Sequence, residues 1–149
     1  MGFLVFGLLL EAFSVLKKGE VLKKIGEVLS GFVKIEFGYV FGSFLGDRGF
    51  RDVDVAIYVS GEDDSYDLMK FSMRVARTLE RRVKPRFEFD VTPLNNAPIA
   101  FQFEVIRSGK LVFSREDVKR VRYEARVISA YLDYKETLDW LNKEFLARI

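Results

Sequence analysis

The sequence predicts an α+β fold, in which a small mixed β-sheet of about four strands is flanked by helices and followed by a long C-terminal helix. Four short segments rich in Val, Ile and Phe alternate with segments whose apolar residues recur at helical spacing. Gly, Pro and polar residues separate them. With 149 residues, the chain has room for one domain with a sizeable core, so we expect a single domain over residues 1–149.

Each predicted element has its own signal. Alternating or continuous apolar residues predict strands over residues 34–41, 52–59, 86–93 and 110–114. In the first of these, Ile35, Phe37, Tyr39 and Phe41 are expected to share one face. Apolar residues three and four positions apart predict helices over residues 20–30, 65–82, 99–107 and 115–147.

The last helix carries two apolar stripes. Ser114 is expected to cap it, with Asp117 at the capping-box position. The broader stripe is predicted to pack into the core: Val118, Val121, Ala125, Ile128, Leu132, Leu138, Leu141 and Phe145. The second stripe flanks the first and is expected to pack rather than to act, with partner contact as the alternative: Tyr123, Val127, Tyr131 and Tyr134.

The N-terminus is unusually apolar, because residues 1–10 contain no charged side chain. The apolar run to Leu16 is too short to cross a bilayer. No basic residue precedes it and no small-residue cleavage site follows it, so it does not match a secretory signal. We expect this N-terminal extension, residues 1–16, to be a buried or partner-covered helix rather than a membrane anchor.

Composition restricts the chemistry. The chain has no Cys and no His, which excludes disulfides, Ser-His-Asp or Cys-His catalysis, and His-ligated zinc. A net charge of +2 gives no broad basic field, so no nucleic-acid partner is expected. Chemistry would have to use carboxylates, Lys, Arg, Tyr or hydroxyls. We expect a cytoplasmic protein without a membrane partner.

The candidate site lies where two predicted strands meet. Gly42 and Ser43 end the first strand, and Asp52 and Asp54 open the next. Because side chains alternate along a strand, the two carboxylates share one face about 7 Å apart. A later strand carries Asp90. An isolated Asp-x-Asp is commonly a solvated turn, but together these residues favour a seat for divalent metal and phosphate.

These motifs resemble the polymerase-β nucleotidyltransferase superfamily, in particular its minimal nucleotidyltransferases. The resemblance covers about residues 20–120. Residues 89–98, Phe-Asp-Val-Thr-Pro-Leu-Asn-Asn-Ala-Pro, and residues 103–113 are similar to MntA-type antitoxins. The resemblance therefore implies a polymerase-β nucleotidyltransferase-like fold.

The resemblance also implies a mechanism, in which AMP passes from ATP to a tyrosine of a partner HEPN-type ribonuclease toxin. Asp52 and Asp54 would bridge two Mg²⁺ ions. Asp90 would hold the ion beneath the attacking hydroxyl and help to deprotonate it. Gly42 and Ser43 would bind the triphosphate.

Four questions stay open from the sequence. Eight residues separate Ser43 from Asp52, two fewer than is usual in the family, so a partner-sequestering protein with a weak or vestigial nucleotide site is one alternative. Transfer to a small-molecule acceptor is another. Arg48 and Arg51 could contact phosphates or could be ordinary surface arginines. The chain could form a homo- or hetero-oligomer.

Overall fold

A four-stranded sheet with the order β3-β2-β1-β4 forms the centre of the structure, a computed structural model that describes residues 2–46, 52–61 and 64–148. The strands are β1 (Ile35–Phe41), β2 (Asp52–Val59), β3 (Glu88–Pro93) and β4 (Lys110–Ser114). β1 is antiparallel to both β2 and β4, whereas β2 is parallel to β3. The predicted mixed sheet is therefore confirmed.

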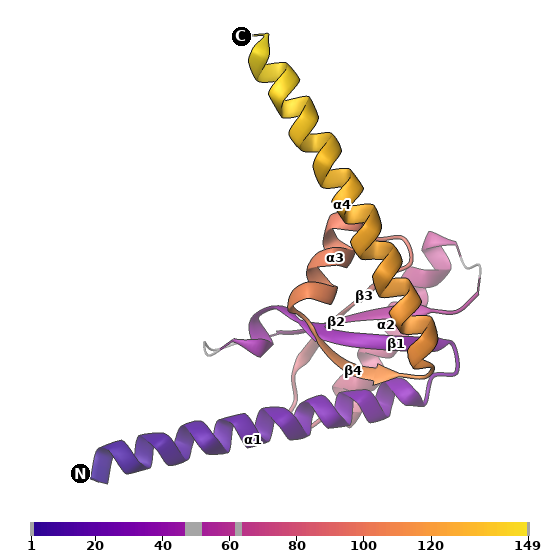
Figure 1. Cartoon of the computed structure of the whole chain (residues 1–149). Coiled ribbons are helices and arrows are strands. Elements are labelled where there is room, and N and C mark those ends of the chain that lie inside the picture. Colours follow the sequence, from indigo (N-terminus) through magenta and orange to yellow (C-terminus); the bar gives the residue numbers. More distant parts are fainter. Residues whose placement is uncertain (1, 47–51, 62–63, 149) are drawn as a thin grey trace.

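Helices cover both faces of the sheet (Figure 1). α1 (Gly2–Ser30) and α2 (Ser65–Arg82) share one hydrophobic core with the sheet, and α2 makes the crossover that parallel strands require. α3 (Ile99–Ser108) and α4 (Asp117–Ala147) share the second core on the opposite face. A short 3-10 turn, η1 (Gly42–Leu45), follows β1.

Most predicted boundaries agree with the structure because local signals set them. α2 spans the predicted residues, and its N-cap residue Asp64 accepts a hydrogen bond from the backbone N–H of Asp67 (2.8 Å). β4 also matches its prediction. One facing prediction is wrong: an irregularity in the pairing of β1 with β2 lies between Ile35 and Phe37. Ile35 therefore packs in the core under α1 and α2, and Phe37 in the core under α3 and α4.

The prediction for the core face of α4 is also wrong. The only described residues of α4 that are buried are Tyr123 and Val127, from the stripe predicted to flank the core. Tyr123 donates to Gln102 Oε1 on α3 (2.6 Å), and Glu124 accepts from the Tyr39 hydroxyl on β1 (2.6 Å). The stripe predicted as core is exposed throughout: Val118, Val121, Ala125, Ile128, Leu132, Leu138, Leu141 and Phe145.

The reason is the length of α4 relative to the body. Its first half packs on α3 and the sheet, and its second half extends beyond both (Figure 1). Apolar residues there have no core to enter, and Phe145 is 70% exposed. The predicted cap is wrong as well: Glu116 is the N-cap residue, without a side-chain cap bond. Ser114 ends β4, where its hydroxyl accepts from Arg120 Nε (3.2 Å).

α1 joins the helices predicted over residues 1–16 and 20–30 into one helix, Gly2–Ser30. Its C-terminal part packs on the sheet, with Val21, Ile25, Val28 and Leu29 buried. Its N-terminal part projects past the sheet (Figure 1). Among the described residues, no helix combines the length and apolar character needed to cross a bilayer.

Two glycines of α1 make a matched test of this packing. A Cβ at Gly26 would overlap the backbone carbonyl of Val112 on β4, whereas a Cβ at Gly19 meets nothing within 4 Å. We expect Gly26→Ala to lower the free energy of unfolding by about 1–3 kcal/mol, as overpacking does. Gly19→Ala should raise it by about 0.5–1 kcal/mol through helix propensity. Urea denaturation measures both, and equal effects would contradict the close contact of α1 with β4.

Candidate active site

Three strand ends bring the predicted site residues together. β1 ends beside the start of β2, so that Phe41 lies opposite Asp54. On the other side of β2, the parallel register places Asp54 opposite Asp90 and Asp52 opposite Glu88. Asp54 is therefore flanked by the Gly42–Ser43 turn on one side and by Asp90 on the other.

The two β2 carboxylates share one face, as predicted. Val53 and Val55 are fully buried in the core under α1 and α2, whereas Asp54 is half-buried and Asp52 is exposed on the opposite face. Asp90 is likewise exposed, next to the buried Phe89. The strand alternation thus presents three carboxylates on the face that α3 and α4 partly cover.

Gly42 is required by the backbone conformation of the turn that follows β1. It has a φ of +78°, a conformation that side chains rarely adopt. A Cβ at this position would also overlap Oδ2 of Asp54. The turn is held from beneath by Phe44, which is buried and meets Phe87 edge to face with ring centroids 6.0 Å apart. Ser43 remains exposed beside the carboxylates.

The electrostatics of the cluster raise the pKa of Asp54. Partial burial is the main cause, and the negative charges of Asp90 and Asp52 add to it. The protein alone therefore disfavours a fully ionised cluster. A bound cation would remove that penalty.

The three acids fit a divalent ion in chemistry, since hard cations such as Mg²⁺ prefer carboxylate oxygens. Their side chains are not drawn together: within the described ranges, no group of three or more acidic side chains is close enough to hold an ion. Binding would require Asp52, Asp54 and Asp90 to converge by side-chain rotation.

A hollow of about 840 Å³ lies beside the cluster, along the β3 edge. Asp52 and Asp90 line it together with Glu88 and Arg86. Glu88 and Arg86 were missed as site residues, although the alternation of β3 places Glu88 on the face of Asp90. Arg86 gives the hollow a cation suited to a phosphate. Arg48 and Arg51 lie outside the described residues.

A protein-family model matches more than half of the chain. The family model described as "Polymerase beta, Nucleotidyltransferase" matches residues 23–118. The chain belongs to the polymerase beta nucleotidyltransferase family. The matched part contains Gly42, Ser43, Asp52, Asp54 and Asp90 and leaves out most of α4. No curated protein sequence gives a significant match.

Solved structures share the fold. A structure from Shewanella oneidensis, described as a tri-AMPylated HEPN toxin in complex with an MNT antitoxin, aligns at a TM-score of 0.60 and 16% identity, over 89% of this chain and 98% of that chain. A toxin–antitoxin structure with AMP-PNP aligns at a TM-score of 0.63 and 19% identity, over 84% of this chain and 98% of that chain. A structure of the MntA–HepT toxin–antitoxin aligns at a TM-score of 0.58 and 16% identity, over 88% of this chain and 97% of that chain.

The raised pKa of Asp54 predicts a pH-dependent stability difference. Because folding disfavours its ionised form, this group opposes folding once the pH rises above the ordinary carboxyl range, near pH 4. In EDTA, Asp54→Asn should therefore be more stable than the original protein at about pH 7, and the gain should shrink as the pH falls towards about 4. Thermal unfolding across pH measures this. Asp133→Asn, on the exposed part of α4, should run parallel to the original protein; if Asp54→Asn also does so, folding does not raise the pKa of Asp54.

Proposed function

We propose that this nucleotidyltransferase is an antitoxin that transfers AMP from ATP to a tyrosine of a HEPN-type ribonuclease toxin in the cytoplasm and so silences it. The observation that carries this proposal is the placement of Asp54 between Asp90 and the Gly42–Ser43 turn. The toxin–antitoxin structures that share the fold support the setting, and one of them is described as containing an AMPylated toxin.

In the proposed reaction, the tyrosine oxygen bonds to the α-phosphorus of ATP while the bond from that phosphorus to the pyrophosphate oxygen breaks. Asp52, Asp54 and Asp90 would hold two Mg²⁺ ions, which supply positive charge to the phosphate oxygens. Asp90, on the neighbouring strand, would help to take the hydroxyl proton. The Ser43 hydroxyl and backbone N–H groups of the turn would donate to the triphosphate, whose β- and γ-phosphates depart together as pyrophosphate.

The partner would dock on the second half of α4. Beyond Tyr131, which is stacked on Phe103 at 3.9 Å between centroids, α4 carries exposed apolar residues from both of its stripes. We call these residues the α4 apolar face: Tyr134, Leu138, Leu141 and Phe145. All four are exposed, and a contiguous exposed apolar surface commonly marks a protein interface. We assign the HEPN-type toxin to this face.

The α4 apolar face also supports a second function, in which the protein silences its partner by binding alone and the nucleotide site is weak or vestigial. In that case the complex would form without transfer. The two functions therefore differ in whether the toxin acquires AMP.

The transfer test uses the full chain, the purified toxin of its own genome, Mg²⁺ and ATP labelled in the α-phosphate. We expect label on the toxin, reduced by a factor of about 100 or more in Asp52→Asn, Asp54→Asn and Asp90→Asn, because each removes charge from the site. Asp67→Asn, an exposed acid on α2, is the matched control and should keep normal transfer. Normal transfer by Asp90→Asn would contradict the site, and a stable complex without label would establish the sequestering function.

The docking test changes the α4 apolar face without touching the core. Leu141→Glu with Phe145→Glu should weaken binding to the toxin by about tenfold or more, since both place charge in an apolar interface. Lys143→Glu is the control, because it lies about 200° around the helix from Leu141. Surface plasmon resonance gives the dissociation constants. If the control weakens binding and the double variant does not, the toxin docks on another face.

A further inference from the structure

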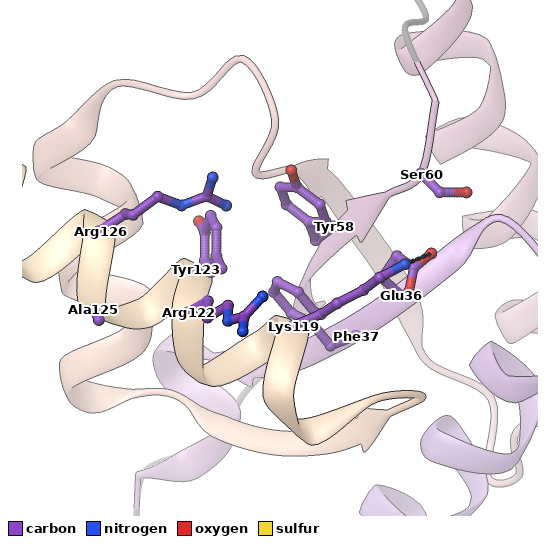
Figure 2. A pocket seen from close by; sticks show the side chains of 9 residues that line it. All are labelled: Glu36, Phe37, Tyr58, Ser60, Lys119, Arg122, Tyr123, Ala125 and Arg126. Atoms are coloured by element: carbon purple, nitrogen blue, oxygen red, sulfur yellow. Dashed lines mark ion pairs between the residues drawn. The ribbon is translucent and has the colours of Figure 1, made fainter.

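We propose that the protein has a second ligand site, between α4 and the far end of β2, which binds a small anion carrying a planar aromatic ring and a phosphate, such as a nucleoside monophosphate. The site is a cavity of about 530 Å³ (Figure 2). This volume lies in the range of small-molecule pockets. The proposal goes beyond the transfer reaction, because none of the residues that line this cavity belongs to the acidic cluster.

The floor of the cavity is aromatic. Phe37 from β1 and Tyr58 from β2 stack with centroids 4.9 Å apart and an interplanar angle of 5°. Tyr123 from α4 meets both rings at 5.0 Å. Phe37 and Tyr123 are buried, whereas Tyr58 is half-buried and borders the cavity. Phe37 covers one face of the Tyr58 ring, and a planar group would stack on the half-exposed part of Tyr58 that borders the cavity.

The rim of the cavity is cationic. Lys119, Arg122 and Arg126 line it from successive turns of α4, and Figure 2 shows their side chains beside the aromatic rings. Lys119 is paired with Glu36 across the cavity (3.8 Å). Arg122 and Arg126 are exposed, and within the part of the chain that the structure describes neither makes a hydrogen bond or ion pair. Figure 2 shows the guanidinium groups of Arg126 and Arg122 on either side of Tyr123. Two such groups beside aromatic rings match a phosphate or carboxylate joined to a ring.

The cavity is separate from the catalytic end of the sheet. Asp54 and Tyr58 lie on the same face of β2, four residues apart, which corresponds to about 13 Å. The carboxylates lie at one end of this face, and the cations of α4 lie near its other end. A phosphate-bearing ligand that lacks a metal ion is repelled by the first and attracted by the second. Metal-free conditions therefore isolate the proposed site.

The test is isothermal titration calorimetry of the full chain with AMP in EDTA. We expect binding that Arg122→Gln with Arg126→Gln weakens by about tenfold or more, because both changed side chains are exposed and lose only charge and donors. Lys135→Gln with Lys143→Gln removes two cations elsewhere on α4 and is the matched control. Asp54→Asn should keep the affinity of the original protein, and inorganic phosphate alone should bind more weakly than AMP because it cannot stack.

Three other outcomes of the titration would overturn the proposal. Absence of AMP binding excludes this ligand class, and binding that is lost in Asp54→Asn but kept in Arg122→Gln with Arg126→Gln places AMP at the acidic cluster. If inorganic phosphate binds as tightly as AMP, the aromatic rings do not contribute to binding. The transfer assay tests the proposed function separately. If the original protein does not label the toxin but still binds AMP in EDTA, the proposed function is rejected and this inference stands.

Discussion

The parallel pairing of β2 with β3 is the constraint on which the site depends. Its register places Asp54 opposite Asp90, and these residues are 36 positions apart in the chain. α2 makes this pairing possible, since parallel strands need a long crossover. The same pairing has an electrostatic cost, because partial burial raises the pKa of Asp54 and the nearby charges of Asp90 and Asp52 raise it further. The fold tolerates that cost because the hydrophobic cores on both faces of the sheet fix the strands independently of the carboxylates.

Those features of the fold that local sequence patterns determine could be predicted from the sequence. Strand alternation placed Asp52 and Asp54 on one face, and apolar residues at helical spacing predicted α2 over residues 65–82. The steric demand that Asp54 makes on Gly42 could not be predicted, because it depends on the position of β1 beside β2. The irregularity in β1 that turns Ile35 to the other core also depends on partner strands.

The error at α4 has a different physical cause. A helical stripe shows which side of a helix is apolar but does not show whether another layer covers it. α4 has two such stripes, and the aromatic one reaches the body because Tyr123 and Tyr131 can meet Gln102 and Phe103 on α3. The larger aliphatic stripe is left in solvent. Apolar surface of this extent is costly in a protein that acts alone, so the exposed stripe is evidence for a partner of α4.

The division of the chain follows from these constraints. The part that the family model matches, residues 23–118, contains the sheet and the acidic cluster, whereas the projecting ends of α1 and α4 lie outside it. A catalytic site needs fixed strands, because small displacements of carboxylates disrupt metal and phosphate contacts. A docking surface needs reach and exposed apolar area, which a helix extending beyond the core provides. α4 joins the two, because its first turns pack against the sheet face that carries Asp54 and its last turns project beyond the body. A ligand bound between Tyr58 and Arg126 would contact both β2 and α4, and would therefore act where the catalytic sheet and the docking helix meet.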